Sequence, residues 1–117
     1  IGSHLVEQLI SMNAKPVILT RQKDPLFLAQ VKDMIEIRIC DLKDRKQVLN
    51  SFEGCSAVLS LAASVAGLEY NAKHPATIFQ ENLETFFNTI GAAKETGVER
   101  FLTTSSACVY PRHCTIP

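Results

Sequence analysis

The chain has 117 residues, of which 46% are hydrophobic, enough for one modest core but not for two. Twelve Lys and Arg residues balance twelve Asp and Glu residues, so the net charge gives no reason to expect nucleic acid or an anionic membrane as a partner. No apolar run approaches the roughly 20 residues that cross a bilayer, and no secretory leader is recognisable. We therefore expect residues 1–117 to form one domain of a cytoplasmic protein.

The cysteines give no sign of a metal centre or a disulfide framework. None of the four stands in a Cys-x-x-Cys pair, and free thiols are typical of a reducing compartment. Three of them, Cys40, Cys55 and Cys114, are expected to be packing residues. Only Cys108 stands where a thiol could do chemistry.

In the first third of the chain, helix-like and strand-like segments alternate. Apolar residues recur with helical spacing behind Gly2, and Pro16 introduces a short apolar run that ends before Arg21. Asp24-Pro25 resembles a helix cap and first helical position. The expected elements are a helix from Gly2 to Asn13, a strand at 17–20, a short helix at 24–34 and a strand at 36–40 that ends before Asp41.

The alternation continues to the end of the chain. Asp44 and Gln47 resemble a capping box, and Gly54 and Gly97 are typical helix stops. Pro75 begins the longest helix, whose apolar positions step by three and four residues at 79, 83, 86, 90 and 93. The expected elements are a helix at 44–54, a strand at 57–62, a loop at 63–74, a helix from Pro75 to Gly97 and a strand beginning at Arg100.

Such alternation predicts an α/β fold, a doubly wound parallel sheet with helices on both faces. In the strand order 3-2-1-4-5, the strand that should precede Gly2 is the central one. We therefore expect the sheet to be incomplete, with the first strand missing between residues 17–20 and residues 57–62.

The run from Arg100 to Pro111 ends in small hydroxyl and thiol side chains. Ligands of open α/β sheets bind outside the carboxyl ends of the strands. Ser106 and Cys108 are two residues apart, so they lie on one face while the chain stays extended. Both are candidate catalytic residues.

Several landmarks, in order and at fitting intervals, carry a resemblance to a known family. Ile-Gly-Ser-His-Leu at the start resembles the end of the Gly-x-x-Gly-x-x-Gly-Ser-His-Leu fingerprint of extended short-chain dehydrogenases/reductases, the NAD-dependent epimerase/dehydratase family, which act on nucleotide sugars. Asp41-Leu42, Leu61-Ala62-Ala63, Asn82 and the block from Val98 to Pro111 match later family motifs. The resemblance covers essentially the whole chain and implies a Rossmann fold that binds NAD or NADP.

The resemblance also implies roles for individual residues. Gly2 would be the third glycine of the fingerprint, Asp41-Leu42 would contact the adenine, and the small residues after Leu61 would lie against the ribose and nicotinamide. The implied cofactor-binding residues are Gly2, Arg21, Asp41, Leu42, Leu61, Ala62, Ala63, Asn82 and Thr104.

For catalysis, the resemblance assigns to Ser106 the hydroxyl that hydrogen-bonds the reacting sugar oxygen. The family completes proton transfer with a Tyr-x-x-x-Lys pair, but Tyr70 is followed four residues later by His74 and Tyr110 by Cys114. We therefore expect residues 1–117 alone to be inactive. A nucleotide-sugar enzyme remains the expectation for the whole protein, with a possible homodimer.

Cys108 narrows the resemblance. Ser-Ser-Ala-Cys-Val-Tyr-Pro is similar to the corresponding run of GDP-mannose 3,5-epimerases and GDP-fucose synthases, in which the cysteine is an acid/base beside a transient 4-keto group. Val65 and Gly67 lie in a loop similar to a substrate loop of the synthases. The alternatives are another family activity (4-epimerase, dehydratase or decarboxylase), a non-catalytic NAD(P)-binding sensor or scaffold, and, for Cys108 itself, a buried packing residue.

Arg21 bears on the choice of cofactor. NAD-specific members carry an acidic residue at the end of the second strand, whereas an arginine there can pair with a 2′-phosphate. The sequence therefore favours NADP over NAD, and the alternative for Arg21 is a solvated surface side chain.

Overall fold

The computed structural model describes residues 1–23, 25–106, 109–111 and 113–114. Its strands are all short, and the helices between them range from seven to 21 residues. The elements in chain order are α1 (Gly2–Ser11), β1 (Val17–Thr20), η1 (Leu26–Met34), β2 (Glu36–Ile39), α2 (Arg45–Ser51), β3 (Ala57–Ser60), α3 (Gly67–Lys73), α4 (Pro75–Glu95) and β4 (Arg100–Thr103).

The strands form two parallel pairs. β1 pairs with β2, from Val17 opposite Glu36 to Thr20 opposite Ile39. β3 pairs with β4, and among the described residues no strand of one pair is hydrogen-bonded to a strand of the other. The expected parallel α/β architecture is confirmed, and so is the expectation that β1 and β3 are not direct neighbours.

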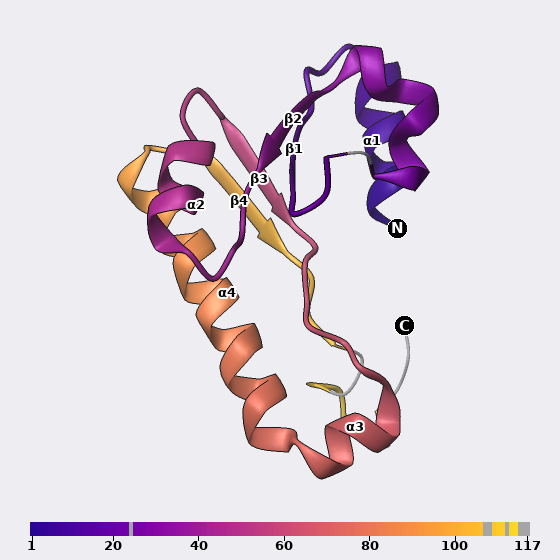
Figure 1. The fold of residues 1–117 in the computed structure, drawn as a ribbon, viewed down its shortest axis with the longest axis vertical. Helices are drawn as coiled ribbons and strands as arrows, with labels where there is room; N and C mark the ends of the chain where they lie inside the picture. Colours follow the sequence, from indigo (N-terminus) through magenta and orange to yellow (C-terminus); the bar gives the residue numbers. More distant parts are fainter. Residues whose placement is uncertain (24, 107–108, 112, 115–117) are drawn as a thin grey trace.

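The helices lie on opposite sides of the strands. Figure 1 shows α1 and η1 beside the β1–β2 pair, and α2 and α4 together on the other side, beside β3 and β4. α2 and α4 pack against each other, as do α1 and η1. This is the two-sided arrangement that the alternation of elements predicts.

The buried core is small and lies between α2, α4 and the sheet. It contains Cys40, Val48, Phe52, Ala92 and Ala93. Burial of one large apolar side chain typically stabilises a fold by about 1.5–3 kcal/mol, so Val48 and Phe52 are major contributors. The core therefore fixes the position of α4 against α2.

Residues that permit tight turns end three of the helices at the expected places. Asn13, just after α1, has a positive φ of 60°, which asparagine tolerates better than most residues. Gly54 and Gly97 also have positive φ angles, 76° and 74°.

Asp44 caps the start of α2, since its side chain accepts hydrogen bonds from the backbone N–H groups of Lys46 and Gln47.

Three segments depart most from the expected elements. Residues 67–73 form helix α3 instead of loop, beginning at Gly67 with a φ of 79°. The strand expected at 57–62 ends at Ser60, where its pairing with β4 ends. Residues 26–34 form a 3-10 helix preceded by Pro25, and the expected cap residue Asp24 lies outside the described residues.

The apolar face expected for α4 is also only partly correct. Phe79 is 66% exposed, and Leu83 and Ile90 are exposed as well. Ala93 is buried as expected, and the other buried positions are the small residues Thr89 and Ala92. Small side chains let α4 approach its neighbours closely at this end.

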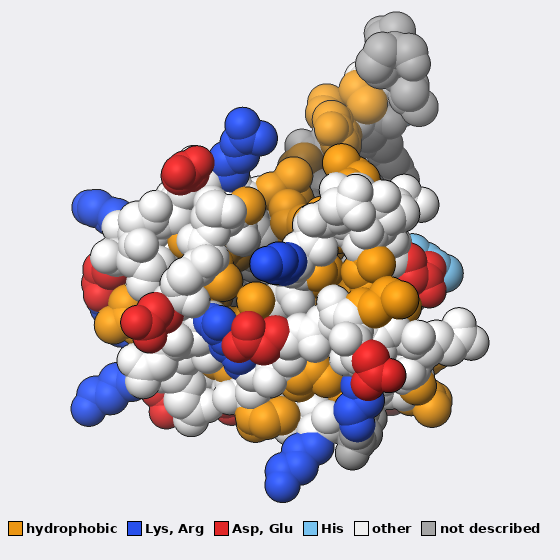
Figure 2. All heavy atoms as spheres, turned by 90° about the horizontal axis from the view of Figure 1, so that it is seen from above, with side chains coloured by type: hydrophobic (Ala, Val, Ile, Leu, Met, Phe, Trp, Pro, Cys, Tyr) orange, Lys and Arg blue, Asp and Glu red, His pale blue; other side chains and the backbone are white. Residues whose placement is uncertain are grey.

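Charges of both signs are interspersed on the surface. On the face drawn in Figure 2, Lys and Arg side chains alternate with Asp and Glu side chains around the rim. This mixture agrees with the zero formal net charge of the sequence. Within the described residues, no helix is both long and apolar enough to cross a membrane.

Candidate functional site

The segments that follow β1, β2 and β3 hold most of the expected cofactor residues. Arg21 directly follows β1, and Asp41 comes two residues after the end of β2. Cys40 N donates to Thr20 O (2.9 Å), so the exits of β1 and β2 lie side by side. Such carboxyl ends are where ligands of open α/β sheets bind.

Gly2 brings the start of α1 to the exit of β3. A Cβ atom built on Gly2 would lie 4.0 Å from Leu61 Cδ1, which is ordinary van der Waals contact. The first turn of α1 contains no acidic residue, and Ile1 and Gly2 are exposed. The positive end of the helix dipole lies at this helix start, and no carboxylate on the first turn neutralises it. Its N–H groups are therefore suited to an anion.

The segment after β2 is fixed by hydrogen bonds on both sides. Asp41 Oδ1 accepts from Lys43 N (3.0 Å), and Asp41 N donates to Gln47 Oε1 (3.0 Å). Asn88 Nδ2 of α4 donates to the carbonyls of Leu42 and Lys43. The Leu42 side chain packs against the core, so this pair of residues is held in one conformation.

Asn82 holds the segment after β3 against α4. Its Oδ1 accepts from Ser64 N (2.8 Å), and its Nδ2 donates to Ser64 O (3.1 Å). A third bond joins Nδ2 to Ile78 O within the helix (2.9 Å). In the structure, the Asn82 side chain therefore fixes the backbone at Ser64, just after the exposed Ala62 and Ala63.

Glu81, the neighbour of Asn82, is a residue that the sequence analysis missed, along with Lys43 and Ser64. Its carboxylate accepts from Lys43 Nζ (2.6 Å) and from Ser64 Oγ (2.7 Å). These bonds, and the charge of Arg21, hold the pKa of Glu81 below its ordinary value, while Glu81 raises the pKa of Lys43. The sequence signal that could have identified Glu81 is its position next to Asn82 in α4. Both side chains bond residues that follow the strands.

The residues expected to be catalytic follow β4. Thr104 N donates to Ser60 O (3.2 Å), which places this segment beside the exit of β3. Ser106 is exposed, and its carbonyl accepts from Val109 N (3.2 Å). Cys108 lies outside the described residues.

The candidate substrate residues precede and begin α3. Val65 is strongly exposed, and Gly67 is the first residue of the helix. Figure 1 shows α3 beyond the exits of β3 and β4. Both residues therefore belong to the segment that continues from β3, and Thr104, two residues before Ser106, is hydrogen-bonded to the last residue of β3.

The other cysteines differ from one another. Cys40 is buried, as expected of a packing residue, and burial raises the pKa of its thiol. Cys55 is half-buried and Cys114 is exposed, so the packing expectation was wrong for Cys114. Among the described residues, no group of His, Cys, Asp and Glu side chains could hold a metal ion.

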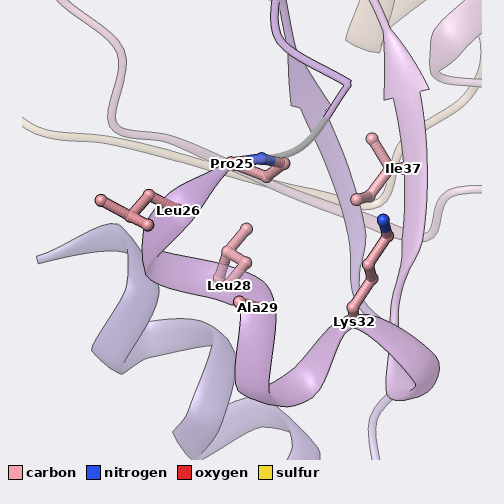
Figure 3. Close-up of a pocket in the computed structure, with 6 residues that line it drawn as sticks. All are labelled: Pro25, Leu26, Leu28, Ala29, Lys32 and Ile37. Atoms are coloured by element: carbon pink, nitrogen blue, oxygen red, sulfur yellow. The ribbon is translucent and has the colours of Figure 1, made fainter.

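A cavity of about 200 Å³ lies elsewhere, between η1 and β2. Figure 3 shows Leu28 from η1 and Ile37 from β2 beside it, with the Lys32 amino group pointing toward Ile37. Binding sites usually add several convergent polar groups to an apolar lining, and this lining is almost wholly apolar. We assign the candidate site to the strand exits.

Residues 1–117, the whole chain, match the sequence profile of the NAD dependent epimerase/dehydratase family. The chain belongs to this family. The membership confirms the resemblance carried by the Gly2, Asp41 and Leu61 motifs.

Among curated proteins, the chain is similar to nucleotide-sugar enzymes. It is 36% identical over 111 residues to GDP-mannose 3,5-epimerase from Arabidopsis thaliana, covering 95% of this chain and 29% of that protein. It is 35% identical over 80 residues to GDP-L-fucose synthase from Dictyostelium discoideum, covering 67% and 25%. The chain thus spans less than a third of the length of these relatives.

Solved structures support the fold. A UDP-glucose 4-epimerase from Stenotrophomonas maltophila with bound NAD and formylated UDP-arabinopyranose matches with a TM-score of 0.84 at 24% identity, over 98% of this chain and 37% of that one. A dTDP-glucose 4,6-dehydratase from Streptomyces venezuelae with NAD and TYD bound matches with a TM-score of 0.71 at 20% identity, over 86% and 34%. The chain has the Rossmann-type α/β fold of these enzymes.

Proposed function

We propose that this chain is the cofactor-binding domain of a nucleotide-sugar epimerase or epimerase/reductase that uses a nicotinamide dinucleotide. The observation that carries the proposal is the convergence of the α1 start with the exits of β1, β2 and β3. Gly2 meets Leu61 there, and the Glu81 carboxylate bonds both Lys43 and Ser64. Family membership supplies the class of chemistry.

The residues at this edge fit a dinucleotide. A helix start with exposed N–H groups and no first-turn acid suits a diphosphate. Exposed Ala62 and Ala63 present little side chain, so a flat ring system could lie close to their backbone. The proposed cofactor residues are Gly2, Arg21, Asp41, Leu42, Leu61, Ala62, Ala63, Asn82 and Thr104.

The proposed catalytic residues are Ser106 and Cys108. The nicotinamide, when bound, would accept a hydride from the sugar and return it. The Ser106 hydroxyl would hydrogen-bond the sugar oxygen whose carbon is oxidised, and the Cys108 thiol would move the proton at the neighbouring carbon. Val65 and Gly67 would contact the sugar nucleotide.

The similarity to a GDP-mannose 3,5-epimerase and a GDP-L-fucose synthase favours a GDP-sugar as substrate. The decisive test is solvent exchange in the full-length protein. With a GDP-hexose in deuterated water, we expect deuterium to enter the sugar ring, and Cys108→Ser to abolish this exchange while dinucleotide binding persists. Inversion at C4 of a UDP-hexose without deuterium uptake would indicate a 4-epimerase instead.

A non-catalytic sensor or scaffold is the alternative from another class. It would bind the dinucleotide and turn over no sugar nucleotide. The sequence of the full-length protein also separates the two, because a Tyr-x-x-x-Lys pair after residue 117 would support an enzyme.

Cofactor preference is proposed from Arg21, which directly follows β1. If Arg21 pairs with a 2′-phosphate, the full-length protein should bind NADP more tightly than NAD, and Arg21→Ala should remove the difference. Equal affinities before substitution would reject this role for Arg21.

A further inference from the structure

Glu81 links parts of the molecule that no strand pairing joins. It lies on α4, Lys43 follows β2, and Ser64 follows β3. Its Oε1 accepts from Lys43 Nζ (2.6 Å) and its Oε2 from Ser64 Oγ (2.7 Å), so both carboxylate oxygens are used. One half-buried carboxylate thus connects the exit of the β1–β2 pair with the exit of the β3–β4 pair.

A second cation stands at the same edge. Arg21 follows β1, whose exit is bonded to that of β2 through Cys40 N and Thr20 O. The positive charge of Arg21 contributes to lowering the pKa of Glu81, so the two side chains interact electrostatically. Asp41 and Glu84 add negative charge near Lys43. The edge therefore combines two cations with carboxylates that offset them.

We propose that Glu81 is a specificity-determining residue for the cofactor, weakening the attraction of Arg21 and Lys43 for a 2′-phosphate. This inference rests on the proposed function, namely that the edge binds a nicotinamide dinucleotide. A phosphate monoester carries about −1.5 to −2 charges near pH 7. Such a group would be repelled by Glu81 and would compete with it for the two cations.

Replacement by glutamine separates charge from structure. Glu81→Gln removes the negative charge and keeps one acceptor oxygen, which can accept from Lys43, while its new NH2 group can donate to the Ser64 hydroxyl, which is able to accept. A purely structural bridge would make Glu81→Gln change the affinities for NADP and NAD by the same factor. A charge-based role changes their ratio.

The experiment measures the dissociation constants of NADP and NAD by calorimetry in the full-length protein. We expect the ratio Kd(NAD)/Kd(NADP) to rise about five- to tenfold in Glu81→Gln, the size of one screened charge interaction at short range. Glu36→Gln is the matched control, because Glu36 also pairs with a basic residue, Arg38 (2.6 Å), but on β2 away from the strand exit. Its ratio should not change.

Lys43→Met provides a second variant should Glu81→Gln fail to fold. It leaves Glu81 without its strongest cationic partner, so the ratio should fall. If both dinucleotides bind and neither variant changes the ratio, the role proposed for Glu81 is rejected, while the proposed function is not. If the unsubstituted protein bound neither dinucleotide, the proposed function would fail and this inference with it.

Discussion

The two strand pairs are parallel and of equal length, but their surroundings differ. The β3–β4 pair lies beside α2 and α4, where Val48, Phe52, Ala92 and Ala93 are buried together with Cys40. The β1–β2 pair lies beside α1 and η1, where Val6 and Leu28 are the buried hydrophobic residues of those two helices. The comparison teaches that the larger buried cluster lies beside α2 and α4 and also receives Leu19 of β1 and Cys40 after β2, whereas α1 and η1 bury one hydrophobic residue each.

The largest expected effect is in the well-packed region. Phe52 is only 4% exposed and lies in the core cluster, so Phe52→Ala should lower the free energy of unfolding by about 3–5 kcal/mol. Urea denaturation of the full-length protein measures this loss. A loss below about 1 kcal/mol would show that the α2–α4 region is not the better-packed one.

Leu28 provides the corresponding test in the other region. It is 8% exposed and lines the cavity between η1 and β2, so its surroundings are already incompletely filled. Leu28→Ala should therefore cost about 2 kcal/mol, the low end for a buried leucine. If urea denaturation gave a loss as large as that of Phe52→Ala, the contrast between the regions would be wrong.

Asn82 tests the hydrogen bonds at the exit of β3. Asn82→Ala removes two bonds to Ser64 and one to Ile78, and should cost about 1–2 kcal/mol. It should also weaken dinucleotide binding, measured by calorimetry, because the segment after Ala63 loses the two hydrogen bonds that hold it against α4. Asn50→Ala, on the exposed face of α2, is the control and should change neither quantity.

The smallest expected effect concerns pH and the cap of α2. Hydrogen bonds from the N–H groups of Gln47 and Lys46, together with the Gln47 side chain, lower the pKa of Asp44. A lowered folded-state pKa gives stabilisation that is present above the ordinary aspartate pKa and disappears as pH falls through the folded value. Asp44→Asn keeps a capping side chain, so it should reduce this acid-side dependence with little change in helix content.

Unfolding midpoints of the two proteins, compared from neutral to acidic pH, check this effect. The difference between them should shrink as pH falls. A difference that grew toward acid would contradict the role of the Asp44 carboxylate.

Much of the fold was predictable because local signals agreed with the final packing. Pro75 begins α4, Gly54 follows α2, and Asn13 ends the turn after α1, each for a backbone reason visible in the sequence. α3 was missed because residues 67–73 bury none of their side chains and so show no helical apolar pattern. The exposure of Phe79 was missed because periodicity identifies an apolar face but not what covers it.

The site was predictable where it follows strands and less so where it depends on helix α4. Arg21 was proposed from its position at the end of a strand, and Asp41 and Leu61 from their match to family motifs; the structure places all three after strands. The network of Lys43, Ser64 and Glu81 was not, because its members are far apart in sequence and meet only through tertiary structure.

The central claim is that a nicotinamide dinucleotide binds where α1 begins and β1, β2 and β3 end. Hydrogen exchange of the full-length protein with and without NADP or NAD tests it most directly. We predict increased amide protection at 2–5, 41–43 and 61–64, with little change in η1. Protection centred on the cavity beside Leu28 and Ile37, with none at the strand exits, would contradict the account.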